Sequence, residues 1–240
     1  MIDIRKTQSA LSAKGYDPGP LDGNWGGKTC TALLAHQAQR QPDAALRALG
    51  VALAPELLKA GIVDTRARLA EALAQTGNET GGYTSFAEDM RYSAAGMMRT
   101  WPSRFPTLES AQPYVGKPVD LANFVYGARM GNQLNGTNDN DGWDCRGGGL
   151  IQHTGRAEYD LLLYRLGVTS EQIHGGEPVP MARAFCDYWG RAKANSYCDR
   201  GDFTGLRGLV NAGNPKLAAS KILGLAQVAV RRARSMGVIA

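Results

Sequence analysis

The chain has few of the residues that bind metals or form cross-links. Its 240 residues include only four cysteines and three histidines. No two cysteines stand in the CxxC spacing of a structural zinc site, and the histidines are scattered, so we expect neither a metal nor a cofactor. In a cytosolic protein the thiols would be reduced, and Cys186 and Cys198 could pair only in an oxidising compartment.

Long apolar runs and long basic blocks are also missing. Without about 18 consecutive apolar residues, the sequence predicts no membrane-spanning helix. Residues 1–6 lack the basic-then-apolar layout of a signal peptide, so we expect the protein to stay in the cytosol until something else releases it. The net charge of +5 is too dispersed for a nucleic-acid binder, but it suits an anionic polymer or surface.

Part of the positive charge lies near the C-terminus. Arg231, Arg232 and Arg234 fall in the last predicted helix. They form either a solvated helix face or a surface that draws the protein to an anionic cell wall or membrane, and both interpretations stay open.

The remaining composition is that of a globular protein, with 43% hydrophobic and 20% charged residues. After residue 43 the apolar residues recur mostly at helical spacing. This spacing predicts a helix over residues 65–78 with Asp64 as its N-cap, and another helix capped by Ser93. Pro55 should begin the second of two short helices before them.

The second half of the chain alternates loops and helices. Residues 131–149 are rich in Gly, Asn and Asp, which is typical of a long loop or a small hairpin. Helices are predicted for residues 181–194 and 217–236, and residues 170–180 read as a break. The fold class is therefore mainly α, with a Gly-rich loop.

Residues 1–41 predict a small helical module separate from a main domain at 44–240. Two helices flank a Gly-Tyr-Asp-Pro-Gly turn and a second turn around Asp22 and Trp25. This order resembles the peptidoglycan-binding type 1 repeat, which implies wall-binding roles for Tyr16, Asp22 and Trp25. The alternative is a helical cap on the main domain, in which Tyr16 or Trp25 is a core aromatic.

Two carboxylates stand close together in the sequence. Glu79 ends a predicted helix, and Glu88 follows nine residues later. Glycoside hydrolysis uses such a pair: one carboxylic acid protonates the leaving oxygen, and the other carboxylate activates water or attacks the sugar. Asp89 is the fallback for the second role, although a surface acid is the simpler interpretation.

A Gly-rich segment at residues 146–159 adds polar groups. Gln152 and Thr154 lie two residues apart, so on an extended segment they would share a face. An amide and a hydroxyl there could hold a sugar and a nucleophilic water.

Residues 44–236 resemble a glycoside hydrolase family 19 domain of the lysozyme-like branch, which includes phage endolysins and chitinases. Five blocks follow that family's motifs in order, at residues 78–82, 88–93, 125–132, 141–159 and 209–213. The resemblance implies a lysozyme-like α-helical fold and an inverting mechanism, which needs room for a water between carboxylates roughly 6.5–9.5 Å apart.

The resemblance also implies roles for individual residues. Glu79 would be the general acid, partly desolvated with a raised pKa, and Glu88 a more exposed, ionised base. Thr154 would help to place the attacking water. The remaining matched positions would bind substrate: Gln152, Asn211, Tyr92, Ser93, Trp143, Arg156 and Lys221. Lys221 stands where an arginine that could pair with the carboxylates is common, and it lacks the bidentate fork.

Four further positions depart from the family pattern. Asn78 replaces a histidine beside the acid, Gly148 an arginine, His153 a leucine and Glu158 an asparagine. These changes put the substrate and the tuning of the site in question. For His153 we favour packing or hydrogen bonding over a role as base.

The leading hypothesis is a monomeric phage or prophage endolysin that cuts the β-1,4 bonds of peptidoglycan as a muramidase. It would wait in the host cytoplasm until a holin releases it to the periplasm or cell wall. One alternative is a chitinase acting on poly-N-acetylglucosamine. Another is a wall-binding protein that kept the fold and lost the chemistry.

Overall fold

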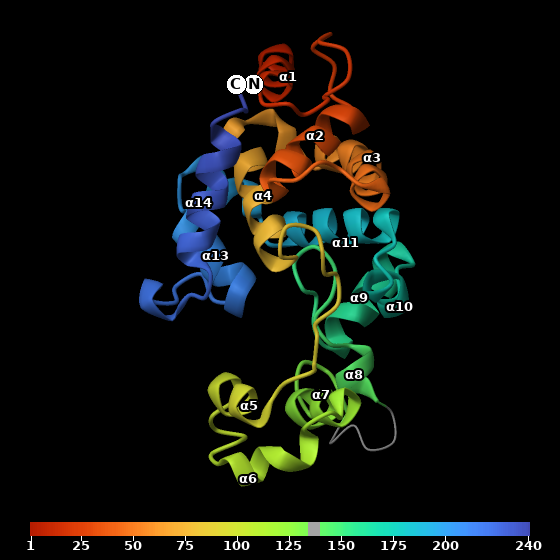
Figure 1. Cartoon of the computed structure of the whole chain (residues 1–240), viewed down its shortest axis with the longest axis vertical. Helices are drawn as coiled ribbons and strands as arrows, with labels where there is room; N and C mark the ends of the chain where they lie inside the picture. Colours follow the sequence, from red (N-terminus) through yellow and green to blue (C-terminus); the bar gives the residue numbers. More distant parts are fainter. Residues whose placement is uncertain (134–139) are drawn as a thin grey trace. The chain divides into compact units, whose positions relative to one another are not determined.

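The computed structural model describes residues 1–133 and 140–240, and it is mainly helical (Figure 1). The chain forms two compact units. Unit 1 combines Met1–Ser85 with Glu177–Ala240, and unit 2 is the intervening Phe86–Gly176. Within the described ranges, β-structure is limited to isolated bridges, and no helix is long and apolar enough to cross a lipid bilayer.

Unit 1 is built around helix α4. This helix, Arg66–Glu79, contacts α2, α12 and α14, and Leu69 and Leu73 are buried on it, as the sequence predicts. Figure 1 shows α14 lying alongside α4. The other elements of the unit are α1 (Ile4–Ala13), α2 (Gly27–Ala38), α3 (Ala44–Lys59), η1 (Ile62–Asp64), α11 (Pro178–Arg191), α12 (Ala194–Asp199), α13 (Phe203–Ala212), η3 (Ala219–Lys221) and α14 (Leu225–Met236).

Unit 2 has its own small core. Met97, Phe105, Leu121 and Val125 are buried together, and aromatic side chains pack around them. Ser93 caps the first helix as predicted, because its hydroxyl accepts a hydrogen bond from the Gly96 amide at 3.1 Å. The elements of the unit are α5 (Ala94–Thr100), α6 (Leu108–Ala111), η2 (Gln112–Tyr114), α7 (Pro118–Tyr126), α8 (Asp141–Asp144), α9 (Arg156–Leu166) and α10 (Ser170–His174).

Two predictions about helix ends in unit 1 are wrong. Pro55 does not start a helix, because it lies inside the continuous α3. Leu53 and Leu57 are buried on either side of it, while Val51, whose carbonyl loses its donor, is exposed to water. The N-cap of α4 is Thr65 rather than Asp64: the Thr65 hydroxyl accepts from the Arg68 amide.

Three predictions about the second half of the chain also need correction. The break predicted at residues 170–180 contains α10 and the first turn of α11. The last helix starts at Leu225, since residues 217–224 hold only the short η3 turn. The loop predicted at 131–149 contains the short helix α8, and its residues 134–139 lie outside the described ranges.

Residues 1–41 pack within unit 1. The Trp25 indole nitrogen donates a hydrogen bond to the Ala54 carbonyl at 2.8 Å, which attaches the second turn to α3. The Asp3 amide donates to the Ala240 carbonyl at 2.8 Å, so both ends of the described chain meet there. A separate module at residues 1–41 stays a prediction.

Candidate active site

One face of α4 carries polar side chains in the interior of unit 1. Glu71, Gln75 and Glu79 recur every four residues, which places them in a row along the helix. The Gln75 amide donates to Glu71 at 2.8 Å, and Arg232 from α14 forms an ion pair with Glu71 at 3.0 Å. Burial raises the pKa of Glu71 despite these partners.

Glu79 ends this row at the edge of the core, where its side chain is 17% exposed. Its Oε1 atom accepts hydrogen bonds from the Arg207 guanidinium and from the Asn78 amide, the latter at 3.2 Å. No described residue donates to its Oε2 atom. The carboxyl group is therefore partly desolvated, as predicted, and fixed through one oxygen while the other is open to a ligand.

Arg207 is the main residue that the sequence analysis missed. Its side chain is 3% exposed, and besides Glu79 it donates to Gln75 Oε1 at 3.0 Å and to the Leu223 carbonyl at 2.8 Å. The guanidinium beside the acid therefore comes from α13. Lys221 is exposed on η3 and forms no ion pair with Glu79, and its predicted role in substrate binding stays a prediction. The sign available in the sequence was Arg207 itself, a charged residue that stands between Leu206 and Gly208.

Asn211 lies one helical turn after Arg207 on α13. Its side-chain oxygen accepts a hydrogen bond from the Leu223 amide at 3.0 Å. Arg207 and Asn211 thus hold the same backbone residue by its carbonyl and its amide. The predicted contact of Asn211 with a sugar is untested and stays a prediction.

Glu88 belongs to unit 2, where three groups hold it. The Tyr126 hydroxyl lies 2.9 and 2.8 Å from the two carboxylate oxygens, and the Gly147 amide donates to Oε2 at 3.3 Å. The Glu88 amide in turn donates to the Gly147 carbonyl at 2.8 Å. This carboxyl group is fixed by both its main chain and its side chain.

The exposure predicted for Glu88 is wrong. The residue is half-buried, and burial raises its pKa above the ordinary value of a glutamate, although the hydrogen bonds from Tyr126 and Gly147 oppose this. The cause is the packing of residues 86–88 against the 147–149 segment, with hydrogen bonds at both ends.

We expect Tyr126→Phe to raise the pKa of Glu88 further, because it removes the hydroxyl that stabilises the ionised carboxylate. A pH titration of the Glu88 carboxyl carbon by ¹³C NMR would measure it. Tyr92→Phe is the matched control, since the structure gives Tyr92 no hydrogen bond to Glu88. An unchanged or lower pKa in Tyr126→Phe would show that the hydroxyl does not act on the carboxylate.

The Gly-rich segment forms a tight turn rather than an extended strand. Gly148 and His153 exchange backbone hydrogen bonds of 3.0 and 2.7 Å, and Gln152 has a left-handed φ of 57°. The predicted shared face of Gln152 and Thr154 is therefore wrong. The turn instead places Gln152 near Glu88: a Cβ added at Gly147 would lie 2.8 Å from Gln152 Oε1 and 3.2 Å from Glu88 Oε2.

Thr154 stands at the end of this turn. Its hydroxyl donates a hydrogen bond to the Gln152 carbonyl at 2.8 Å, and the residue is half-buried. The hydroxyl oxygen keeps its acceptor capacity for a water hydrogen. The predicted placing of an attacking water by Thr154 remains untested.

The structure explains the glycine at 148. A Cβ there would lie 2.5 Å from the His174 ring and 2.8 Å from the Tyr159 hydroxyl, so no larger side chain fits. His174 from α10 fills this space and contacts the Arg146 carbonyl at 3.1 Å. His153 is buried and lies 2.9 Å from Glu158, which confirms the hydrogen-bonding role favoured for it.

A comparison with known proteins decides the family. A protein of Haemophilus influenzae described as a glycosyl hydrolase family 19 domain-containing protein is 35% identical over 147 residues, which are 60% of this chain and 72% of the relative. The chain belongs to glycosyl hydrolase family 19. No family model matches the sequence. The protein is thus a glycoside hydrolase, and its mainly helical architecture agrees with the lysozyme-like fold of family 19.

Other predicted family 19 positions in unit 2 have structural contacts. Trp143 packs against the small core, and the Arg146 guanidinium stacks on its ring at 3.7 Å. Arg156 forms an ion pair with the buried Asp141. Tyr92 packs on Trp101 with ring centroids 4.9 Å apart. Their substrate-binding roles, and that of Ser93 beyond its cap, stay predictions.

Asp89 differs from Glu88 in its environment. It lies on the surface, where hydrogen bonds from Arg91 lower its pKa to about 2. Such a weak base is poorly suited to accept a proton from water near neutral pH. This carboxylate fits the surface interpretation.

A pocket of about 220 Å³ lies in the predicted wall-binding segment of this family 19 protein. Asp22 and Trp25 both line it, and Asp22 is held by the Gln8 amide at 3.2 Å and the Asn24 amide at 2.9 Å. Tyr16 does not line this pocket, and it packs edge-on against His36. Two of the three residues predicted to bind the wall, Asp22 and Trp25, therefore line the same pocket.

Proposed function

We propose that this family 19 glycoside hydrolase cuts the β-1,4 glycosidic bonds of peptidoglycan. The observation that carries the proposal is the carboxyl group of Glu79, which sits at the edge of the unit 1 core with one oxygen held by Arg207 and the other open. A positioned, partly desolvated carboxyl group is what protonation of a glycosidic oxygen requires.

The proposed chemistry divides the work between two carboxyl groups. Glu79 protonates the leaving oxygen, and Glu88 removes a proton from the water that attacks the sugar carbon. Thr154 orients that water, and Gln152 and Asn211 hold the sugar. The attack inverts the configuration of the sugar, as the resemblance implies.

Two features favour peptidoglycan over chitin. The net charge of +5 suits an anionic cell wall. The pocket lined by Asp22 and Trp25 offers an acceptor and an aromatic face to a wall fragment. We further propose that the protein is a phage endolysin that acts as a monomer in the periplasm or cell wall after a holin opens the membrane.

Digestion of purified Gram-negative peptidoglycan tests the proposal, with the reducing ends identified by mass spectrometry. We expect new muramic-acid reducing ends. New glucosamine reducing ends would still show a glycoside hydrolase, but one that cuts the other β-1,4 bond of the glycan strand. Cleavage of chitin oligomers with no product from peptidoglycan would assign the protein to the chitinases, and no product from either would favour a wall-binding protein.

A further inference from the structure

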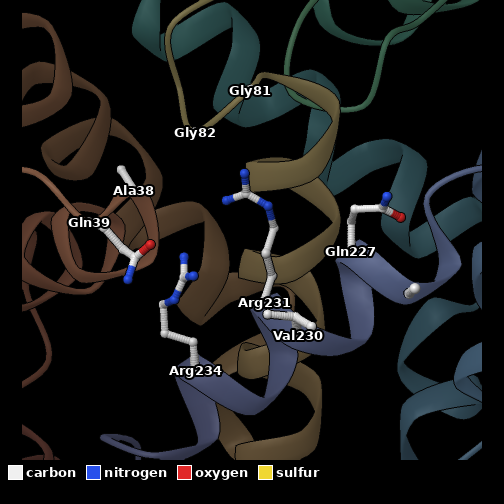
Figure 2. Close-up of a pocket in the computed structure, with 9 residues that line it drawn as sticks. Ala38, Gln39, Gly81, Gly82, Gln227, Val230, Arg231 and Arg234 are labelled. Atoms are coloured by element: carbon white, nitrogen blue, oxygen red, sulfur yellow. The ribbon is translucent and has the colours of Figure 1, made fainter.

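A second pocket in unit 1 has a volume of about 440 Å³ (Figure 2). It lies where the C-terminal end of α2, the turn after α4 and the exposed side of α14 meet. Nine residues line it: Ala38, Gln39, Gly81, Gly82, Ala226, Gln227, Val230, Arg231 and Arg234. Two are arginines and none of these nine carries a carboxylate, so the pocket is positively charged.

The two arginines point the same way. Figure 2 shows both guanidinium groups extending from α14, that of Arg231 towards the Gly81–Gly82 turn and that of Arg234 beside Gln39. Both residues are half-buried, which corrects the interpretation of the last helix as a solvated face. The membrane contact predicted for this helix stays a prediction.

The two arginines differ in their contacts. The Arg234 guanidinium stabilises another helix, whereas no contact among the described residues gives the Arg231 guanidinium a structural role. Arg234 donates to the Gln37 carbonyl at 2.8 Å and so satisfies the end of α2. The Arg231 guanidinium has no hydrogen bond or ion pair within residues 1–133 and 140–240. Burial lowers its pKa, and the charge of Arg234 acts in the same direction. A half-buried arginine still keeps its charge, and leaving that charge without a partner is costly.

The pocket adjoins the segment that carries the proposed acid. A Cβ added at Gly77 would lie 3.2 Å from Arg231 Nη1, so the guanidinium lies against the last turn of α4, two residues before Glu79. Gly81, two residues after Glu79, lines the rim. Residues two positions apart on a helix point to nearly opposite sides, so the pocket and the Glu79 carboxyl group flank the same end of α4, one helix diameter of roughly 10 Å apart.

The chemistry of the proposed substrate supplies such an anion. Peptidoglycan carries a short peptide with free carboxylates on each muramic acid, whereas chitin carries no charge. Resting on the proposed function, we infer that the Arg231–Arg234 pocket binds a carboxylate of the stem peptide and makes the enzyme prefer glycan strands that carry peptides. Arginine suits this role because its planar fork matches a carboxylate.

The test compares two substrates and three full-length proteins. The substrates are native peptidoglycan and the same material with its carboxylates converted to methylamides. The proteins are the wild type, Arg231→Gln and the control Arg47→Gln, which removes an exposed arginine from α3 of the same unit. We expect Arg231→Gln to raise KM on the native substrate about tenfold, the effect of one charge-assisted hydrogen bond, with kcat unchanged.

On the methylamide substrate, wild type and Arg231→Gln should match, and Arg47→Gln should follow the wild type on both. Because Arg231 holds no partner and its half-buried charge is costly, its replacement should not lower the melting temperature. An equal rise in KM on both substrates, or a rise that accompanies a lower melting temperature, would overturn the proposed carboxylate binding by the pocket. The proposed hydrolase activity would stand. No cleavage of either substrate by the wild type would overturn the proposed function and the pocket with it.

Discussion

Replacing Glu79 with glutamine should lower kcat on peptidoglycan by about 10³-fold, which is the range that general acid catalysis contributes. The amide cannot give up a proton to the leaving oxygen. Its carbonyl oxygen can still accept the hydrogen bonds from Arg207 and Asn78, so the fold should persist, although with lower stability because the buried Arg207 loses its counter-charge. Initial rates of reducing-end release, together with circular dichroism of the variant, measure both expectations.

Two further variants sharpen this experiment. Glu88→Gln should lose activity to a similar degree, because it removes the proposed base. Asp89→Asn should keep the wild-type rate, because that carboxylate is paired with Arg91 on the surface. Full activity in Glu79→Gln would exclude it as the acid, and loss in Asp89→Asn with full activity in Glu88→Gln would exchange the roles of the two neighbours.

The second large effect concerns stability. Arg207→Met should cost about 3–5 kcal/mol of the free energy of unfolding, because it removes one partner from a buried pair. Glu79 would lose its counter-charge, and the Gln75 oxygen and Leu223 carbonyl would lose a donor. Urea unfolding followed by tryptophan fluorescence measures the change.

A double-mutant cycle separates the ion pair from the other bonds. In a Glu79→Gln background, Arg207→Met should cost less, by about 1–3 kcal/mol, since no unpaired carboxylate remains. Arg68→Met is the control: its partner Asp199 is 42% exposed, and loss of that pair should cost less than about 1 kcal/mol. An equal cost for Arg207→Met in both backgrounds would mean that the carboxylate contributes nothing to the effect.

The sequence was sufficient where local spacing decides the structure. Leu69 and Leu73 at helical spacing predicted the buried side of α4, and Ser93 was correctly predicted as the N-cap of α5. It was insufficient where a distant partner decides. Pro55 stays within α3 because the flanking leucines are buried against other helices, which no local rule contains.

In the candidate site, too, the sequence predicted what local motifs decide and missed what distant partners decide. Residues Glu79 and Glu88 were found from the family motifs, but their environments were not. The Arg207 guanidinium reaches Glu79 across 128 residues of sequence, and Tyr126 reaches Glu88 across 38. The left-handed backbone at Gln152 lies in the turn that the Gly148 and His153 hydrogen bonds close, and glutamine as a residue type gives no sign of it.

The insertion of unit 2 into unit 1 has a consequence for the order of synthesis. Helix α4 leaves the ribosome with Glu79, but Arg207 follows 128 residues later, after the whole of unit 2. At translation rates of roughly 5–20 residues per second, that delay is on the order of ten seconds. During that interval unit 2 can fold, while the carboxyl group of Glu79 still lacks its ion-pair partner Arg207. A nascent chain interrupted before α13 therefore contains the proposed acid without the arginine that positions it.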